Sequence, residues 1–211
     1  MEFLRTYTAA DLLKYFTPRE GETKLGQTVN LTINENEESE FVLIGIPEDI
    51  GPRANYGKSG SYNAWESFLS KFLSMQSNST FKGSNIVIGG EVKVDDLQLQ
   101  AHDVSISELR RIVEIIDLRV QSVIEEVLEN GKTPIVIGGG HNNAYGNIKG
   151  TALGKSKAIN VINFDAHTDF RSLEGRHSGN GFSYAFKQNF INKYFMFGLH
   201  ENYTSKKILK S

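Results

Sequence analysis

Five short, continuous runs of apolar residues constrain the fold of this chain more than any other feature of its sequence. Such a run lacks the apolar–polar alternation of a half-buried strand, so it is typical of a strand buried on both faces, as in a parallel sheet. The runs lie at residues 41–49, 84–92, 133–139, 158–166 and 193–199.

Helical patterns separate several of these runs. Residues 105–130 carry apolar side chains at three- and four-residue steps, begin with the capping box Ser105-x-x-Glu108, and stop at Asn130-Gly131. Residues 63–75 show the same spacing, and residues 9–16 could form a shorter helix. Residues 50–62, rich in Gly, Ser and Asn, predict a loop. Strands alternating with helices predict an α/β fold with a mostly parallel sheet.

Composition excludes several classes of protein. Lys+Arg 23 against Asp+Glu 25 gives a charge of -2, which argues against a nucleic-acid partner. The chain has no cysteine, so disulfides and thiolate metal sites are excluded. No apolar run approaches the ~20 residues of a membrane span, and the first residues do not resemble a signal peptide. We therefore expect a cytoplasmic protein without a membrane partner.

A glycine triplet followed by His141 ends the third apolar run. The sequence IVIGGGHNNAYGN at 135–147 matches neither common nucleotide-binding glycine pattern, so a nucleotide site is disfavoured. The glycines permit a sharp turn and a close approach of backbone. Taken alone, His141 is either a structural histidine or a ligand.

The fourth run ends in Asp165, His167 and Asp169. Side chains two and four residues apart point the same way while a chain stays extended, so these groups would converge. Two carboxylates and an imidazole crowded together favour a cation, and this donor set suits Mn²⁺, Mg²⁺, Fe²⁺ or Zn²⁺. A solvated turn cluster is the alternative.

The Gly-Gly-Gly-His of 138–141 followed by Asp-Ala-His-Thr-Asp at 165–169 resembles the ureohydrolase family of arginases, agmatinases and formimidoylglutamases. The resemblance covers about residues 41–200. It implies a three-layer α/β/α fold of the arginase/deacetylase type, incomplete in this chain. We accordingly divide the chain into an N-terminal extension, residues 1–40, and the N-terminal part of the ureohydrolase domain, residues 41–211.

Three segments resemble the formimidoylglutamase branch more than the arginases: GGGHNNAYGNIKG, residues 45–64, and SGNGF at 178–182. In the last, Ser178 stands where arginases carry a catalytic histidine, and His177 is one residue away. His177 is thus either catalytic or an exposed loop histidine.

The resemblance implies hydrolysis of a carbon–nitrogen bond in a formimino or guanidino substrate by two Mn²⁺ ions that share a hydroxide. Asp165 would bridge both ions, His141 and Asp169 would ligate one, and His167 the other. Asp169 would also contact the nucleophile. The substrate would be a small amino-acid-derived molecule, most simply formimidoylglutamate, in amino-acid catabolism.

For the amino-acid end of that substrate, Arg53 is a candidate because a guanidinium matches a carboxylate. A structural tie within its own loop is the alternative for Arg53. Asn180 and Ser178 are further candidates for substrate binding. Arginase or agmatinase activity remains an alternative, as does a non-catalytic interaction or assembly module with little metal.

One departure from the family pattern affects these expectations. Family members supply two more aspartates from a later S-x-D-x-D segment, which this sequence does not contain. We therefore expect an N-terminal part of a longer enzyme that is homo-oligomeric when complete. Alone, it would have an incomplete metal site, little activity and two strand edges facing water.

Overall fold

The computed structural model describes residues 1–33 and 39–204. Its strands are β1 (Leu4–Arg5), β2 (Phe41–Gly45), β3 (Ile86–Val92), β4 (Thr133–Ile137), β5 (Ile159–Phe164) and β6 (Ile191–Phe197). The α-helices are α1 (Ala9–Leu12), α2 (Ile50–Ala54), α3 (Ala64–Phe72), α4 (Asp95–Gln100), α5 (Ile106–Glu129), α6 (Asn143–Gly154) and α7 (Gly181–Lys187). Short 3₁₀ turns are η1 (Leu25–Gln27), η2 (Ser61–Asn63) and η3 (Glu201–Tyr203).

The strands form two sheets. Four strands lie in the order β1-β3-β2-β4, with β2 parallel to both of its neighbours and β1 antiparallel to β3. Strands β5 and β6 form a separate parallel pair. The expected α/β fold with a mostly parallel sheet is confirmed, and the division into two sheets is a feature that the apolar runs did not predict.

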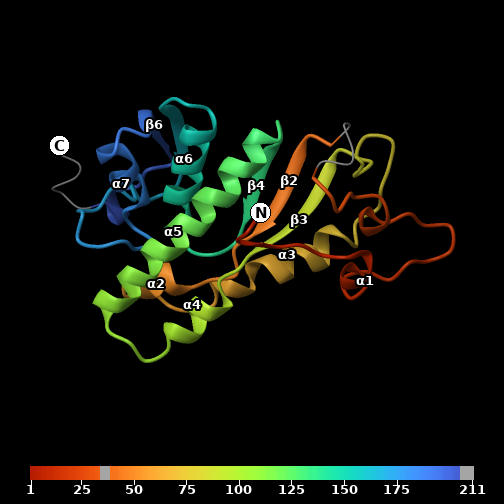
Figure 1. The fold of residues 1–211 in the computed structure, drawn as a ribbon, viewed down its shortest axis with the longest axis horizontal. Coiled ribbons are helices and arrows are strands. Elements are labelled where there is room, and N and C mark those ends of the chain that lie inside the picture. The colour runs from red at the N-terminus through yellow and green to blue at the C-terminus, as the bar shows by residue number, and fades with distance from the viewer. Residues whose placement is uncertain (34–38, 205–211) are drawn as a thin grey trace.

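Helices cover both faces of the four-stranded sheet (Figure 1). Alternation along β2 sends Val42 and Ile44 into one apolar cluster with α5, while Leu43 enters a second cluster with Trp65 of α3. All four of these side chains are buried because both faces of the sheet are covered. This region has the three layers that the resemblance implies.

The pair β5–β6 is covered on one face within the described part of the chain. Its inner residues pack with Tyr145 of α6 and Phe182 of α7, and Figure 1 shows these helices gathered beyond α5. The opposite face is exposed: Phe164 retains 75% of its accessible surface and Phe197 retains 58%. Among the described strands, β4 pairs only with β2 and β5 only with β6, so each has an unpaired edge, as the resemblance implied.

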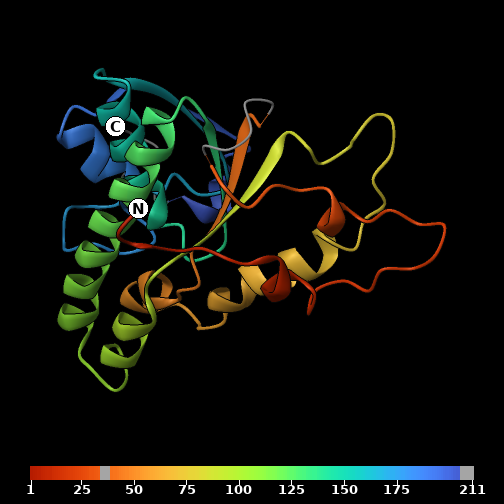
Figure 2. The ribbon, with the colours of Figure 1, turned by 45° about the vertical axis from the view of Figure 1, so that its right-hand side comes forward.

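The segment before β2 packs along the helix α3 (Figure 2). Leu12 and Phe16 are buried in the same cluster as Trp65, and β1 adds a fourth strand to the sheet. Residues 1–33 therefore contribute to the core, although the division of the chain at residue 40 stays a prediction.

The expectation of an uninterrupted loop over residues 50–62 is wrong, because α2 and η2 lie within it. Ile50 and Ala54 are both fully buried in the cluster formed with α5. Burial of these two side chains stabilises a turn of helix that its glycine and proline content concealed.

Helix α5 agrees with its prediction to within a residue at each end. Ser105 Oγ accepts a hydrogen bond from the Glu108 amide at 3.2 Å, which satisfies one free N–H of the first turn. Gly131 follows the last turn with φ 71°, in the left-handed region that favours glycine. Over the described residues, no helix is both long and apolar enough to span a bilayer.

Candidate functional site

The turn between β4 and α6 presents His141. Gly138 and Gly139 have φ values of 85° and 73°, which side chains other than glycine rarely adopt. A Cβ added at Gly139 would lie 2.4 Å from Asn143 Nδ2, so space excludes one as well. The chain can therefore turn sharply after β4 and place His141 immediately before α6.

Asp165, His167 and Asp169 follow β5, which ends at Phe164. The alternation of a strand therefore does not bring these groups together, contrary to the reasoning from the sequence. Instead, Asp165 Oδ1 accepts the His167 backbone N–H at 2.9 Å in a tight turn, and Asp169 adopts φ 44°.

These two segments meet at the carboxyl ends of β4 and β5. His141 Nδ1 lies 2.5 Å from Asp169 Oδ2 and 3.3 Å from Asp165 Oδ2. One donor atom from each of these three residues falls within 4.8 Å of the others. His167 lies beside the group, with its Nδ1 3.2 Å from Asp165 Oδ1.

Electrostatics in the cluster favour a bound positive charge. The hydrogen bond with Asp169 is the main reason that the pKa of His141 is raised, with a further contribution from Asp165. Burial acts to raise the pKa of Asp165, but hydrogen bonds from His167 together with the nearby His141 lower it, and the net pKa is lowered. Both shifts favour the charged forms of these two side chains, as expected when a carboxylate and an imidazole lie side by side.

The donor set fits a divalent cation. Carboxylate oxygen combined with imidazole nitrogen, without thiolate, is the ligand chemistry of Mn²⁺ and related ions. The three grouped residues are a partial site rather than a closed shell, since His141 keeps 42% of its side chain exposed.

A cavity of about 920 Å³ opens beside the cluster. His141, Asp165, His167 and Asp169 line it, together with Asn55, Arg171, Ser172, Ser178 and Tyr203. The site residues and the two ends of the loop after them, residues 170–172 and 178–179, therefore line one continuous concavity.

Among the described residues that line the cavity, Arg171 is the arginine or lysine side chain. The sequence analysis did not predict it as a site residue. Its Nη1 donates to Asn55 Oδ1, and its Nη2 lies 3.2 Å from Glu174 Oε1. Asn55 Nδ2 in turn donates to Ser178 Oγ at 3.3 Å. The signal in the sequence was its position, two residues after Asp169.

Of the residues predicted to bind substrate, Ser178 lines the cavity and Arg53 does not. Arg53 donates from Nη2 to the Ala101 carbonyl, and its Nη1 lies 3.4 Å from Asp49 Oδ1. These contacts correspond to the alternative of a structural tie, so the placement of Arg53 does not support its predicted substrate role.

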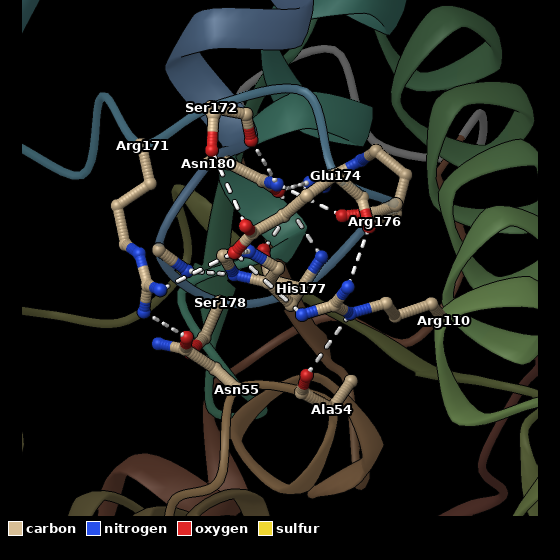
Figure 3. Close-up of polar contacts among 12 residues, drawn as sticks. Ala54, Asn55, Arg110, Arg171, Ser172, Glu174, Arg176, His177, Ser178 and Asn180 are labelled. Atoms are coloured by element: carbon tan, nitrogen blue, oxygen red, sulfur yellow. Dashed lines mark hydrogen bonds and ion pairs between the residues drawn. The ribbon is translucent and has the colours of Figure 1, made fainter. Parts of the chain in front are cut away.

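His177 is fully buried inside the loop over residues 171–180 (Figure 3). Its Nδ1 accepts the Gly179 N–H at 3.1 Å, and its Nε2 lies 3.1 Å from Glu174 Oε1. Burial lowers the pKa of His177 to about 4. His177 does not line the cavity, so its catalytic role stays a prediction that this placement does not support.

Asn180 is buried in the same loop, and both its amide oxygen and its amide nitrogen hydrogen-bond within that loop. Its Oδ1 accepts from Arg176 Nη1 and from the His177 N–H, and its Nδ2 donates to the carbonyls of Ser172 and Gly175. It is absent from the cavity lining, so its predicted role in substrate binding is likewise unsupported by its position.

A buried ion pair that the sequence analysis missed anchors this loop. Arg176 Nε donates to Asp117 Oδ2 at 2.8 Å, and Nη2 donates to Oδ1 at 3.2 Å. The guanidinium also stacks near the rings of Tyr145 and Tyr184, at 4.9 and 5.1 Å from their centroids. The feature of the sequence that could have revealed this pair is Asp117, an acidic residue on the buried face of α5, because a buried carboxyl group needs a partner.

This chain is similar in sequence to known proteins. The family model described as the arginase family matches residues 39–210. Formimidoylglutamase from Streptococcus gordonii is 29% identical over 170 residues, which are 77% of this chain and 47% of that protein. Formimidoylglutamase from Streptococcus pyogenes is 29% identical over 174 residues, covering 79% and 48%. The chain thus spans about half the length of the curated relatives it matches.

Solved structures show the same fold. Trypanosoma cruzi formiminoglutamase crystallised with Mn²⁺ aligns with a TM-score of 0.67 at 21% identity, over 90% of this chain and 61% of that one. Formimidoylglutamase from Bacillus subtilis aligns with a TM-score of 0.67 at 18% identity, over 90% and 57%. A hypothetical agmatinase from Burkholderia thailandensis aligns at 0.63 and 15% identity, over 84% and 54%.

Proposed function

Because this chain belongs to the arginase family, we propose that it carries part of the active site of a manganese-dependent hydrolase acting on formimidoylglutamate. In this reaction water supplies the oxygen of formamide, and the bond between the formimino carbon and the glutamate nitrogen breaks. Glutamate is the second product. We place the reaction in the catabolism of amino acids in the cytoplasm.

The observation that carries the proposal is the convergence of His141, Asp165 and Asp169 at one edge of the sheets. These residues, with His167 adjacent, would hold Mn²⁺, and two ions would be bound in a complete site. The metal would supply Lewis-acid chemistry, lowering the pKa of a water and stabilising charge that develops on the substrate. Asp169 would accept a hydrogen bond from that water.

Arg171 favours an acidic substrate. Its guanidinium lines the same cavity as the metal cluster, and a guanidinium binds carboxylates through charge-assisted hydrogen bonds. Formimidoylglutamate has two carboxylates, arginine has one and agmatine has none. Asn55 contacts both Arg171 and Ser178, so it would orient the two groups that face the substrate's amino-acid end.

A panel of three substrates tests the assignment. The natural polypeptide that carries this sequence is loaded with Mn²⁺ and given formimidoylglutamate, arginine or agmatine. We expect formamide from the first and no urea from the others. Release of urea from arginine or agmatine, without formamide, would instead assign arginase or agmatinase activity.

A second candidate function follows from the exposed apolar face of β5–β6. Phe164, Phe195 and Phe197 lie there, and an unpaired strand edge lies beside them. Such a surface favours association, and the second candidate is therefore a metal-poor assembly module. Size-exclusion chromatography with metal analysis distinguishes the two: a metal-free oligomer supports the module, and stoichiometric Mn²⁺ supports the enzyme. We propose that the active enzyme is itself a homo-oligomer.

A further inference from the structure

We propose that Glu48 is a positioning residue for His141, acting through the glycine turn that presents the imidazole. Glu48 follows β2 and is fully buried, and the sequence analysis gave it no role. The inference rests on the proposed function in assigning His141 to a metal centre. The part that concerns the turn itself depends only on the contacts of Glu48.

The Glu48 carboxylate accepts three hydrogen bonds. Oε1 accepts the Gly140 N–H at 2.6 Å and Asn143 Nδ2 at 2.7 Å, and Oε2 accepts the Gly51 N–H at 3.0 Å. Gly140 directly precedes His141, and Asn143 follows it two residues later. One carboxyl oxygen therefore accepts hydrogen bonds from residues on both sides of His141 in the turn.

No cationic side chain within the described residues lies at ion-pair distance from Glu48. Its carboxyl oxygens are held by N–H donors alone, in a fully buried position. Moving the turn would leave these buried oxygens without donors, and a buried polar group lacking partners is strongly disfavoured. The carboxylate thus opposes displacement of the turn.

The packing of the turn agrees with this role. A Cβ at Gly139 would lie 2.9 Å from Glu48 Oε1 and 2.8 Å from the Ile46 carbonyl. Only glycine lets the backbone approach Glu48 this closely. The glycine turn and the carboxylate are therefore complementary in shape as well as in hydrogen bonding.

The chain on the other side of His141 is held as well. The carbonyl of Asn142, the next residue, accepts Arg176 Nη2 at 2.9 Å, and Arg176 is itself buried. His141 consequently lies between Gly140, which donates to the buried Glu48 carboxyl, and Asn142, which accepts from the buried Arg176 guanidinium. Its backbone is fixed on both sides although its imidazole is partly exposed.

Glu48 also reaches the other wall of the cavity. Gly51 donates its N–H to Glu48, and its carbonyl accepts the Ser178 N–H at 3.1 Å. The same carboxylate therefore helps to set the distance between the metal cluster and the loop that contains Ser178. A displacement of the cluster or of the loop by about 1 Å would be expected to lower the catalytic rate.

The neighbouring residue Asp49 provides a matched control. It is also a buried carboxylate, but it accepts the Gly60 N–H at 3.0 Å, and Arg53 and Gln98 each lie 3.4 Å away. None of these partners belongs to the turn that presents His141. Asp49→Asn therefore replaces a buried carboxyl group of the same segment without releasing that turn.

The test compares Glu48→Gln and Asp49→Asn with the unmodified chain by Mn²⁺ titration, at a temperature where circular dichroism shows each one folded. Glu48→Gln places an amide N–H opposite one of the three donors. We expect its Mn²⁺ affinity to fall by about tenfold or more, as when groups that orient metal ligands are lost, and that of Asp49→Asn to change by less than about twofold. Equal affinities for the two variants overturn the proposal.

NMR of the unmodified chain covers the case in which Glu48→Gln does not fold. The Gly140 amide should be shifted downfield and should exchange slowly, because it donates a short bond to a carboxylate. An ordinary shift with rapid exchange overturns the proposal.

If the unmodified chain alone binds no Mn²⁺, as an incomplete site would predict, the role of Glu48 is decided by NMR instead. His141 ring shifts that change in Glu48→Gln and not in Asp49→Asn then support the positioning role. Unchanged shifts in both variants refute it.

Discussion

Asp117 and Arg176 form an ion pair that is almost wholly buried, with side chains only 3% and 2% exposed. The pair joins α5 to the loop that borders the cavity, and Arg110 of α5 reinforces the connection by donating to the carbonyls of Glu174 and Ala54 (Figure 3). The conformation of the loop therefore depends on a helix that contributes nothing to the cavity lining.

Removing one partner of this pair should be strongly destabilising. Asp117→Ala leaves the Arg176 guanidinium buried without its counter-ion, and we expect the free energy of unfolding to fall by about 3–5 kcal/mol. The surface pair Asp96–Arg119, at 2.6 Å with Asp96 half exposed, supplies the control. Asp96→Ala should cost about 1 kcal/mol or less. Urea denaturation measures both, and equal losses would contradict the difference in burial.

Mn²⁺ should stabilise the folded chain through His141. At a free concentration about 100 times the dissociation constant, a ligand of the native state adds about 2.7 kcal/mol. The melting temperature should therefore rise with Mn²⁺, and His141→Ala should abolish most of that rise. His102→Ala is the control, since His102 is exposed and pairs with Asp103 at the surface. A full Mn²⁺ response in His141→Ala would argue against the cluster as the binding site.

Arg171, and not Arg53, should determine the use of an acidic substrate. Loss of a charged hydrogen bond costs about 1.5–3 kcal/mol, so Arg171→Ala should lower kcat/KM for formimidoylglutamate by about 10- to 100-fold. Arg53→Ala should change it by less than about threefold, because Arg53 lies outside the cavity lining. Steady-state kinetics on the natural polypeptide, with Mn²⁺ binding checked separately, would reveal the reverse order if the assignment is wrong.

His177 should make the chain less stable as the pH falls from about 6.5 to about 4. Its pKa is about 4 in the folded state, because of burial, and about 6.5 when unfolded. Between these values the unfolded chain binds more protons, so stability rises with pH across this window. The contribution is at most about 3 kcal/mol. His177→Gln, which cannot titrate, should have a shallower pH dependence in urea denaturation. An NMR titration showing a pKa near 6.5 in the folded chain would contradict the expectation.

Patterns of neighbouring residues predicted the helices that interactions between neighbouring residues stabilise. The spacing of apolar residues and the capping group at Ser105 fixed α5 closely, because periodicity and capping depend only on nearby residues. Helix α2 was missed because Ile50 and Ala54 are stabilised by distant packing against α5 rather than by their own propensities.

The sequence also predicted that three candidate metal ligands would lie together, but for a partly incorrect reason. His141, Asp165 and Asp169 do converge, yet the turn at Asp165 brings the later residues round after β5 has ended. The ends of β4 and β5 meet although the two strands belong to separate sheets.

The sequence by itself determined the five apolar strands, the long helix α5 and the acidic and imidazole groups that are candidates for binding a metal, since short-range patterns encode all three. Only the tertiary structure decided which polar groups between residues 171 and 180 face the cavity. An irregular loop has no periodicity to orient its side chains, so long-range contacts orient them. Here the bond from Arg176 to Asp117 and the burial of His177 direct those groups inward and leave Arg171 beside the metal cluster.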